Sequence, residues 1–199
     1  MIEPATLEDV VEGDDAVIAE ADESFIPLSD PDVTVAELEA VNAVLTSPKL
    51  SSGPAVEAFE AAFAGYLGRK YAIAVPSGTL GLLFTLAAYE IGTDAEVIAS
   101  PYSFRETQHA ISIAGARPVF ADIDYWAGTL VPAKVEARIT EKTRAIVASN
   151  NNGHPAAWAE LRDVAKRHGL ILIEDSTEAI GSKYQGALVG TFGDASVFD

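Results

Sequence analysis

A short run of small and hydroxyl residues follows the apolar stretch YAIAV (71–75) and leads directly into a helical pattern. The run reads Pro76-Ser77-Gly78-Thr79. At a helix start, free backbone N–H groups and the helix dipole together favour an anion. Gly78 lets the backbone approach a ligand closely, and the two hydroxyls can donate hydrogen bonds to a phosphate. Plain helix capping by Ser77 or Thr79 explains the same residues, so the run alone leaves both interpretations open.

Two other predicted strand ends carry side chains suited to a planar ligand. Phe104 closely follows EVIAS (96–100) and can stack on a ring, although packing in the core or at an interface is the commoner role of phenylalanine. Asp175 follows LILIE (170–174), where a carboxylate is costly unless it meets a cation or a protonated donor, such as a ring nitrogen. A cap on the next turn or a structural ion pair is the alternative for Asp175.

A third strand end, Asn150-Asn151-Asn152-Gly153-His154, offers amides, which do not transfer protons near neutral pH. We interpret His154 as a loop residue rather than a base, because no carboxylate partner is evident beside it. The chain has three histidines and no cysteine, so we expect no metal site.

These side chains can share a site only if the strands before them run parallel. Strand-like runs occupy 71–75, 96–100, 117–121, 144–149, 170–174 and 195–199. Helical patterns separate most of them, at 79–91, 106–115, 132–139 and 156–169, and two more precede the first, TVAELEAVNAVL and PAVEAFEAAFAGYLG. This alternation predicts an α/β, doubly wound, mostly parallel sheet with helices on both faces. Ligands in such sheets bind beyond the carboxyl ends of the strands, so we expect Gly78, Thr79, Phe104 and Asp175 around one pocket.

Acidic residues concentrate at the start of the chain. Of 30 Asp and Glu, 13 lie in residues 1–48, which contain none of the 13 Lys and Arg. We therefore divide the chain into an acidic N-terminal extension, 1–25, either a loose tail or a docking arm, and one large domain, 26–199. The net charge of -17 argues against nucleic acid as a partner. No apolar run is long enough for a membrane span and no signal peptide is evident, so we expect a cytoplasmic protein.

Five segments, in order, together resemble the DegT/DnrJ/EryC1/StrS family of pyridoxal-phosphate sugar aminotransferases. They are SSGPAVEAFEAAFAGYLGRKYAIAVPSGTLGLLFTLAA, SPYSF, GARPVFADID, LILIEDSTEAIGSKYQG and GTFGDASVFD, and the resemblance covers roughly 26–199. It implies the three-layer large domain of a fold type I aminotransferase, incomplete in this chain. It also implies a nucleotide-linked keto sugar as substrate, an amino acid as donor, and either a homodimer or a complex with a completing chain.

The resemblance also assigns roles to single residues. It implies that Gly78 and Thr79 hold the cofactor phosphate, that Phe104 stacks on the pyridine ring and that Asp175 pairs with the protonated ring nitrogen, which keeps the ring an electron sink. Glu178 stands where members place Gln or His near the phenolic oxygen of the cofactor.

Besides Glu178, three departures from the family pattern widen the functional interpretation. The Schiff-base lysine of members lies a few residues beyond GDASVFD (193–199), so no catalytic residue can be assigned. Asp199 replaces a phosphate-binding serine, and Asn150-Asn151-Asn152-Gly153 replaces His-x-Tyr-Gly. The chain is therefore part of an aminotransferase, a lysine-independent pyridoxamine-phosphate sugar dehydratase, or a non-catalytic homologue or partner subunit. The cofactor is accordingly pyridoxal or pyridoxamine phosphate, or none is bound.

Overall fold

The computed structural model describes residues 31–199, so the predicted extension, 1–25, and its boundary lie outside the described residues. The chain divides into two units between Ser51 and Ser52. In the first unit, helix α2 (Val35–Leu45) begins at a capping box: the Thr34 hydroxyl accepts the Ala36 N–H, and the Glu37 carboxylate accepts the Thr34 N–H. This helix confirms the first predicted helical pattern.

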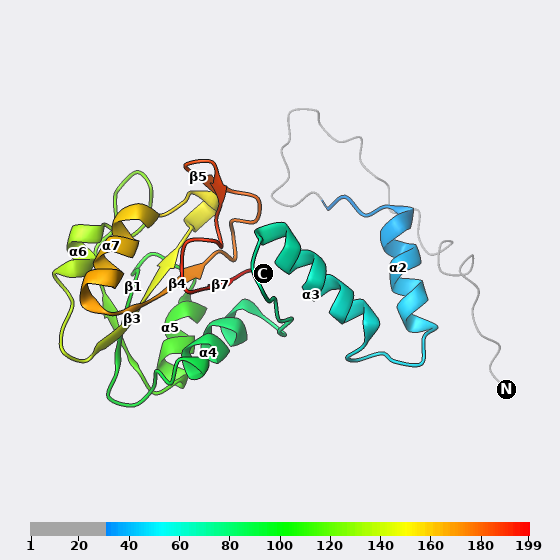
Figure 1. Cartoon of the computed structure of the whole chain (residues 1–199), viewed down its shortest axis with the longest axis horizontal. Helices are drawn as coiled ribbons and strands as arrows, with labels where there is room; N and C mark the ends of the chain where they lie inside the picture. The colour runs from blue at the N-terminus through cyan, green and yellow to red at the C-terminus, as the bar shows by residue number, and fades with distance from the viewer. Residues whose placement is uncertain (1–30) are drawn as a thin grey trace, which may run out of the picture. The chain divides into compact units, whose positions relative to one another are not determined.

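A five-stranded parallel sheet organises the second unit, residues 52–199 (Figure 1). Its order is β2-β1-β3-β4-β7, and every pairing is parallel. The strands are β1 (Glu96–Ala99), β2 (Arg117–Phe120), β3 (Thr143–Ser149), β4 (Ile171–Asp175) and β7 (Ala195–Val197). The predicted α/β parallel sheet is thereby confirmed, at five of the six predicted runs.

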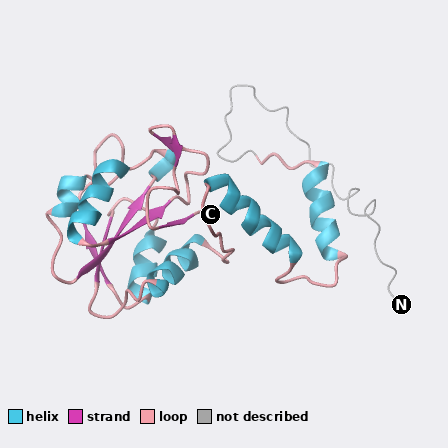
Figure 2. Cartoon of the chain, viewed as in Figure 1, coloured by secondary structure: helices cyan, strands magenta, loops and turns pink. Residues whose placement is uncertain are grey.

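Helices cover both faces of this sheet (Figure 2). Helices α4 (Gly78–Ala88) and α5 (Arg105–Ile113) pack on one face, and α6 (Pro132–Glu136) and α7 (Trp158–His168) pack on the other. Successive strand residues point to opposite faces, so Leu172 of β4 joins the core under α6 and α7 while Ile173 joins the core under α4 and α5. Burial on both faces explains the near-continuous apolar strands of the sequence.

The predicted strand at 71–75 is wrong. These residues follow α3 (Pro54–Leu67) and form no strand, and Tyr71 and Ile73 are 73% and 79% exposed. The Ala74 N–H is donated to a carboxylate of α3, Glu60 Oε1, at 2.8 Å. A β-rich sequence becomes a strand only when a neighbouring strand takes its backbone hydrogen bonds, and none does so within the described chain.

A small hairpin and a 3₁₀ turn complete the second unit, and the sequence patterns predicted neither. The hairpin pairs β5 (Lys183–Tyr184) with β6 (Ala187–Leu188), and the turn, η1 (Asn151–Gly153), follows β3. Strands of two residues are too short to show any periodicity in sequence.

Glu174, a buried residue of β4, fixes the loop that leads into β7. Its carboxyl oxygens accept the backbone N–H groups of Gly190, Phe192 and Gly193 at 2.5–2.6 Å. Arg69 donates to the carbonyls of Gly190 and Gly193 and lies 3.6 Å from the same carboxyl group. Burial raises the pKa of Glu174, and the three N–H donors and Arg69 oppose part of that rise.

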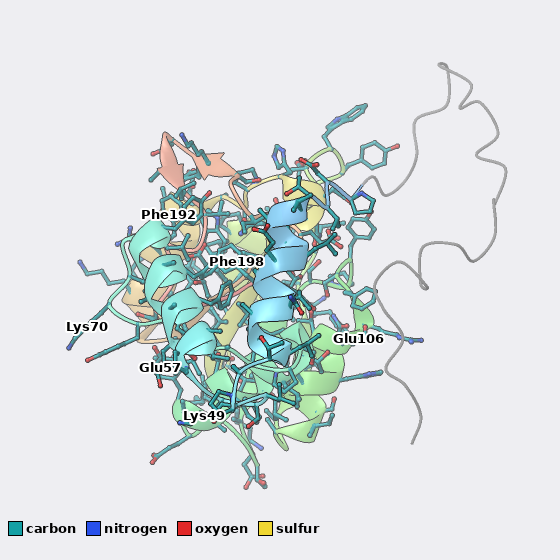
Figure 3. The ribbon with its side chains drawn as sticks, turned by 90° about the vertical axis from the view of Figure 1, so that its right-hand side faces the viewer. Lys49, Glu57, Lys70, Glu106, Phe192 and Phe198 are labelled. Atoms are coloured by element: carbon teal, nitrogen blue, oxygen red, sulfur yellow. The ribbon has the colours of Figure 1, made fainter. Side chains whose placement is uncertain are left out.

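Beyond β7 the chain packs back against α3. Phe198, labelled in Figure 3, meets the Phe63 ring of α3 edge-on, with 5.2 Å between ring centroids. The segment from β7 to Asp199 is thus held by the loop before it and by α3 beside it.

Candidate active site at the carboxyl edge of the sheet

Asp175 is a buried carboxylate at the end of β4, with only 4% of its surface exposed. Its Oδ2 accepts the hydroxyls of Thr107 and Ser149, both at 3.0 Å, and its Oδ1 accepts the Thr177 hydroxyl at 2.8 Å. All three donors are neutral, and Asp175 forms no ion pair within residues 31–199. The carboxyl group is held in place by neutral donors alone, and no cationic side chain of the described residues faces it.

A pocket opens beside this carboxylate at the carboxyl edge of the sheet. Its lining comes from the last residues of β3 and β4 and from the loops that follow β1, β3 and β4: Phe104, Ser149, Asn150, Asn151, Asp175, Thr177 and Glu178. Phe104 immediately precedes α5 and is 68% exposed, so its ring is not used in the core. Of the predicted site residues, the structure brings Phe104, Asp175 and Glu178 together here.

Two buried amides hold the loops around this pocket. Asn151 donates to the carbonyls of Tyr102 and Gly128, at 2.7 and 2.6 Å, which links the loops after β1, β2 and β3. Asn150 accepts the Ala156 N–H and the Trp158 indole N–H, at 2.9 and 3.0 Å. The side-chain amides of Asn150 and Asn151 at this strand end therefore hold the neighbouring loops together.

Glu178 is an exposed residue that anchors the turn after β3. Its Oε2 accepts the Asn152 N–H at 2.8 Å, and Asn152 has a positive φ of 51°. A carboxylate rather than a neutral amide thus borders this side of the pocket. His154, in the same segment, is exposed, as expected of a loop residue.

The head of α4 carries the predicted anion-binding run. Ser77 caps the helix by accepting the Leu80 N–H at 3.3 Å, and the Gly78 N–H is donated to Asp199 Oδ2 at 3.2 Å. Thr79 is the second residue of the helix, and its hydroxyl has no hydrogen-bond partner within residues 31–199. Ser77 therefore caps the helix, the Gly78 N–H meets a carboxylate of the chain itself, and binding of a phosphate here stays a prediction.

Thr177 connects this helix head to the pocket. A Cβ built on Gly78 would lie 2.8 Å from the Thr177 methyl group, and Thr177 also lines the pocket and contacts Asp175. Gly78 therefore borders the same site as Asp175, although neither Gly78 nor Thr79 lines the pocket itself.

The two ends of the site differ in how well they suit the expected cofactor. At the Asp175 end, a buried carboxylate with three neutral donors fits a protonated ring nitrogen, which would supply the missing positive partner. At the α4 end, the Asp199 carboxylate lies where a phosphate would bind. The residues present thus fit the ring, and they fit the phosphate only if Asp199 moves.

Another, larger pocket lies at the opposite edge of the sheet, lined by residues 89–95, Arg144, Gly169 and Ile171. It lies at the amino ends of the strands, whereas ligands of open parallel sheets bind beyond the carboxyl ends. We therefore assign the site to the carboxyl edge.

Residues 31–199 contain no group of three or more histidines and carboxylates placed to hold a metal ion. No helix in the same residues is long and apolar enough to cross a membrane.

Sequence reasoning missed the side chains that hold Asp175. Ser149 is the register partner of Asp175, and each ends its own strand, so aligning the strand ends identifies it. Thr107 is the third residue of α5, and no local pattern in the sequence indicates that it contacts Asp175.

Known proteins resemble this chain in both sequence and fold. Residues 31–199 match the DegT/DnrJ/EryC1/StrS aminotransferase family. The spore coat polysaccharide biosynthesis protein SpsC of Bacillus subtilis is 40% identical over 174 residues, which cover 87% of this chain and 45% of that protein. The chain therefore spans less than half of the length of this relative.

Solved structures give the same result. An aminotransferase from Psychrobacter cryohalolentis superposes with a TM-score of 0.82 at 36% identity, covering 86% of this chain and 44% of that one. Helicobacter pylori PseC, an aminotransferase involved in the biosynthesis of pseudoaminic acid, gives 0.83 at 33% identity, covering 87% and 47%. Both are similar to this chain over nearly all of its described part.

Proposed function

Because the chain belongs to the DegT/DnrJ/EryC1/StrS aminotransferase family, we propose that it forms the ring-binding and phosphate-binding half of a pyridoxal-phosphate-dependent sugar aminotransferase. The substrate under this proposal is a nucleotide-linked keto sugar, and the donor is an amino acid. The named roles of SpsC and PseC in polysaccharide and pseudoaminic acid biosynthesis support a sugar substrate. A cytoplasmic location and assembly into a dimer, or with a completing chain, belong to the same proposal.

The environment of Asp175 is the observation that supports this function most directly. A buried carboxylate with no cationic partner in the described chain is costly, and a pocket wall is where a ligand can supply the missing charge. A protonated pyridine nitrogen is such a partner, and the exposed Phe104 ring at the same pocket can cover one face of a planar ligand.

Under this proposal, the site residues of this chain bind and orient the cofactor and do not transfer protons. Asp175 would hold the proton on the ring nitrogen, and Thr107 and Ser149 would keep its carboxylate aimed. The N–H groups at the head of α4, from Gly78 and Thr79, would bind the phosphate once the Asp199 carboxylate turns away from the Gly78 N–H. The cofactor supplies an electron sink for amino transfer when bound.

The exposed apolar side chains of the second unit support a completing partner. Five of these side chains are between 49% and 79% exposed: Phe59, Tyr66, Tyr71, Ile73 and Phe84. Phe59 and Tyr66 both pack against the Phe63 ring on α3, so apolar surface is contiguous there, and a contiguous exposed apolar surface is typical of one that another polypeptide covers.

The test is a half-reaction with the intact protein. We would add pyridoxal phosphate, record the visible absorbance, and then add glutamate without a keto substrate. Conversion of the aldehyde form to the amine form at one equivalent per site supports the proposal. Borohydride reduction followed by mass spectrometry identifies the lysine that holds the cofactor. An intact, folded protein that shows neither adduct nor conversion would leave a non-catalytic homologue as the better interpretation.

A further inference from the structure

The anion site at the head of α4 already holds an anion from this chain. Asp199 Oδ2 lies 3.2 Å from the Gly78 nitrogen, in the position that the helix dipole and the free N–H groups favour for a negative group. The capping serine does not fill this position, because its hydroxyl accepts the Leu80 N–H, two residues further along the helix than Gly78.

The space above Gly78 is also occupied. A Cβ on Gly78 would lie 2.8 Å from the Thr177 methyl group, 3.2 Å from Asp199 Oδ2 and 3.5 Å from the Asp199 Cβ. A phosphate that approached the Gly78 N–H would therefore collide with the Asp199 side chain and would also be repelled by its charge.

The backbone that carries Asp199 is fixed close to the site. Val197 is the register partner of Asp175, and its carbonyl accepts the Ser176 N–H at 2.8 Å. The Phe198 ring packs edge-on against Phe63. With both preceding residues held, rotation of the Asp199 side chain is the smallest movement that releases the Gly78 N–H.

We propose that Asp199 is a specificity-determining residue that competes with the phosphate of a ligand for the head of α4. This inference rests on the proposed function for the identity of the ligand's ring. A phosphate must displace one carboxylate and then stay beside it, and like charges in contact repel. The site consequently gains little from a phosphate group and binds unphosphorylated pyridoxal almost as well as pyridoxal phosphate.

Asp199→Ser and Asp199→Asn in the intact protein test this competition. Asp199→Ser replaces the carboxylate with a hydroxyl donor, and Asp199→Asn keeps the shape but removes the charge. Glu90→Gln is the matched control, because it removes one negative charge just beyond the other end of α4. The dissociation constants of pyridoxal and pyridoxal phosphate are measured for each protein, and the ratio of the two is compared.

In the natural protein we expect the dissociation constants of pyridoxal and pyridoxal phosphate to lie within about fivefold of each other. In Asp199→Ser their ratio should shift at least tenfold in favour of pyridoxal phosphate. The shift should be smaller in Asp199→Asn and absent in Glu90→Gln. A natural protein that already prefers pyridoxal phosphate more than tenfold, or an Asp199→Ser variant with an unchanged ratio, would overturn the inference.

A second measurement separates this inference from the proposed function. The amide resonance of Gly78 is followed while inorganic phosphate is added. Saturable shifts in Asp199→Ser, with a phosphate dissociation constant at least tenfold higher in the natural protein, support the competition. This holds even if neither pyridoxal form binds, and in that case the proposed function alone fails. Equal saturation in both proteins would contradict the competition whatever the cofactor results.

Discussion

Ser149 and Asp175 are register partners at the carboxyl ends of β3 and β4, and the serine hydroxyl lies 3.0 Å from Asp175 Oδ2. The parallel pairing that places the two strand ends side by side therefore also builds the support of the candidate ring-binding carboxylate. The site and the sheet depend on the same register.

Asp175→Asn should weaken binding of the cofactor ring. The amide keeps the shape of the side chain but cannot offset the charge of a protonated ring nitrogen. We expect pyridoxal phosphate to bind at least tenfold more weakly to this variant of the intact protein, measured by visible absorbance. Asp122→Asn, an exposed carboxylate in the loop after β2, is the control and should bind as the natural protein does. Equal affinity in both variants would remove Asp175 from the binding site.

Glu174→Gln should destabilise the second unit by about 1–3 kcal/mol, because the new amide group turns a donor toward at least one of the three N–H groups that the carboxyl group accepts. Urea unfolding measures this free energy, and Glu141→Gln, an exposed position, serves as control.

The same carboxyl group should make stability depend on pH. Burial raises the pKa of Glu174 in the folded state above its ordinary value near 4.5, so the folded protein holds this proton more tightly than the unfolded chain. The Glu174 contribution is present below the ordinary value and is lost as the pH rises through the raised value. Subtracting the Glu174→Gln profile should reveal this decline. A difference that grows with rising pH would contradict it.

Glu136→Gln should change acid stability in the opposite sense. Arg167 and then His168 hydrogen-bond the Glu136 carboxylate and lower its pKa to about 2. The stabilising contribution is therefore present above the ordinary value and is lost as the pH falls toward about 2. We expect the natural protein to be more stable than the variant near neutral pH, with the difference disappearing in acid and shrinking in high salt, since these groups are exposed. A difference that persists at pH 2 would contradict this account.

Asn151→Ser should loosen the rim of the pocket while the sheet stays intact. The variant loses both amide hydrogen bonds, to the carbonyls of Tyr102 and Gly128. Amide hydrogen exchange should accelerate in the loops after β1 and β2, with no change in β3 and β4. Unchanged exchange in both loops would show that other contacts hold them.

How far the sequence predicts this structure depends on the range of the interactions involved. The runs that became β1, β3 and β4 are identifiable because burial on both faces imposes continuous apolar character. Residues 71–75 have the same apolar character, but no strand among residues 31–199 pairs with them, so the local β preference predicted a strand that does not form. Strand ends located Phe104 and Asp175, since topology alone brings them to one edge.

The supporting contacts escaped prediction for a different reason. Thr107 reaches Asp175 across 68 positions of sequence, and the Asp199 carboxylate reaches Gly78 across 121. Such contacts depend on side-chain placement after the layers have packed, and no periodic pattern records them. The resemblance marked Asp199 as unusual, but only the structure shows which backbone group it contacts.

The central claim is that Asp175 binds a protonated pyridine nitrogen. The most direct test measures the ¹⁵N chemical shift of the ring nitrogen of labelled pyridoxal phosphate, bound at saturating concentration to the intact protein. The spectrum is recorded above the pH at which the free ring loses its proton. The account predicts the shift of a protonated ring in the natural protein and of an unprotonated ring in Asp175→Asn. The shift of an unprotonated ring in the natural protein would contradict it.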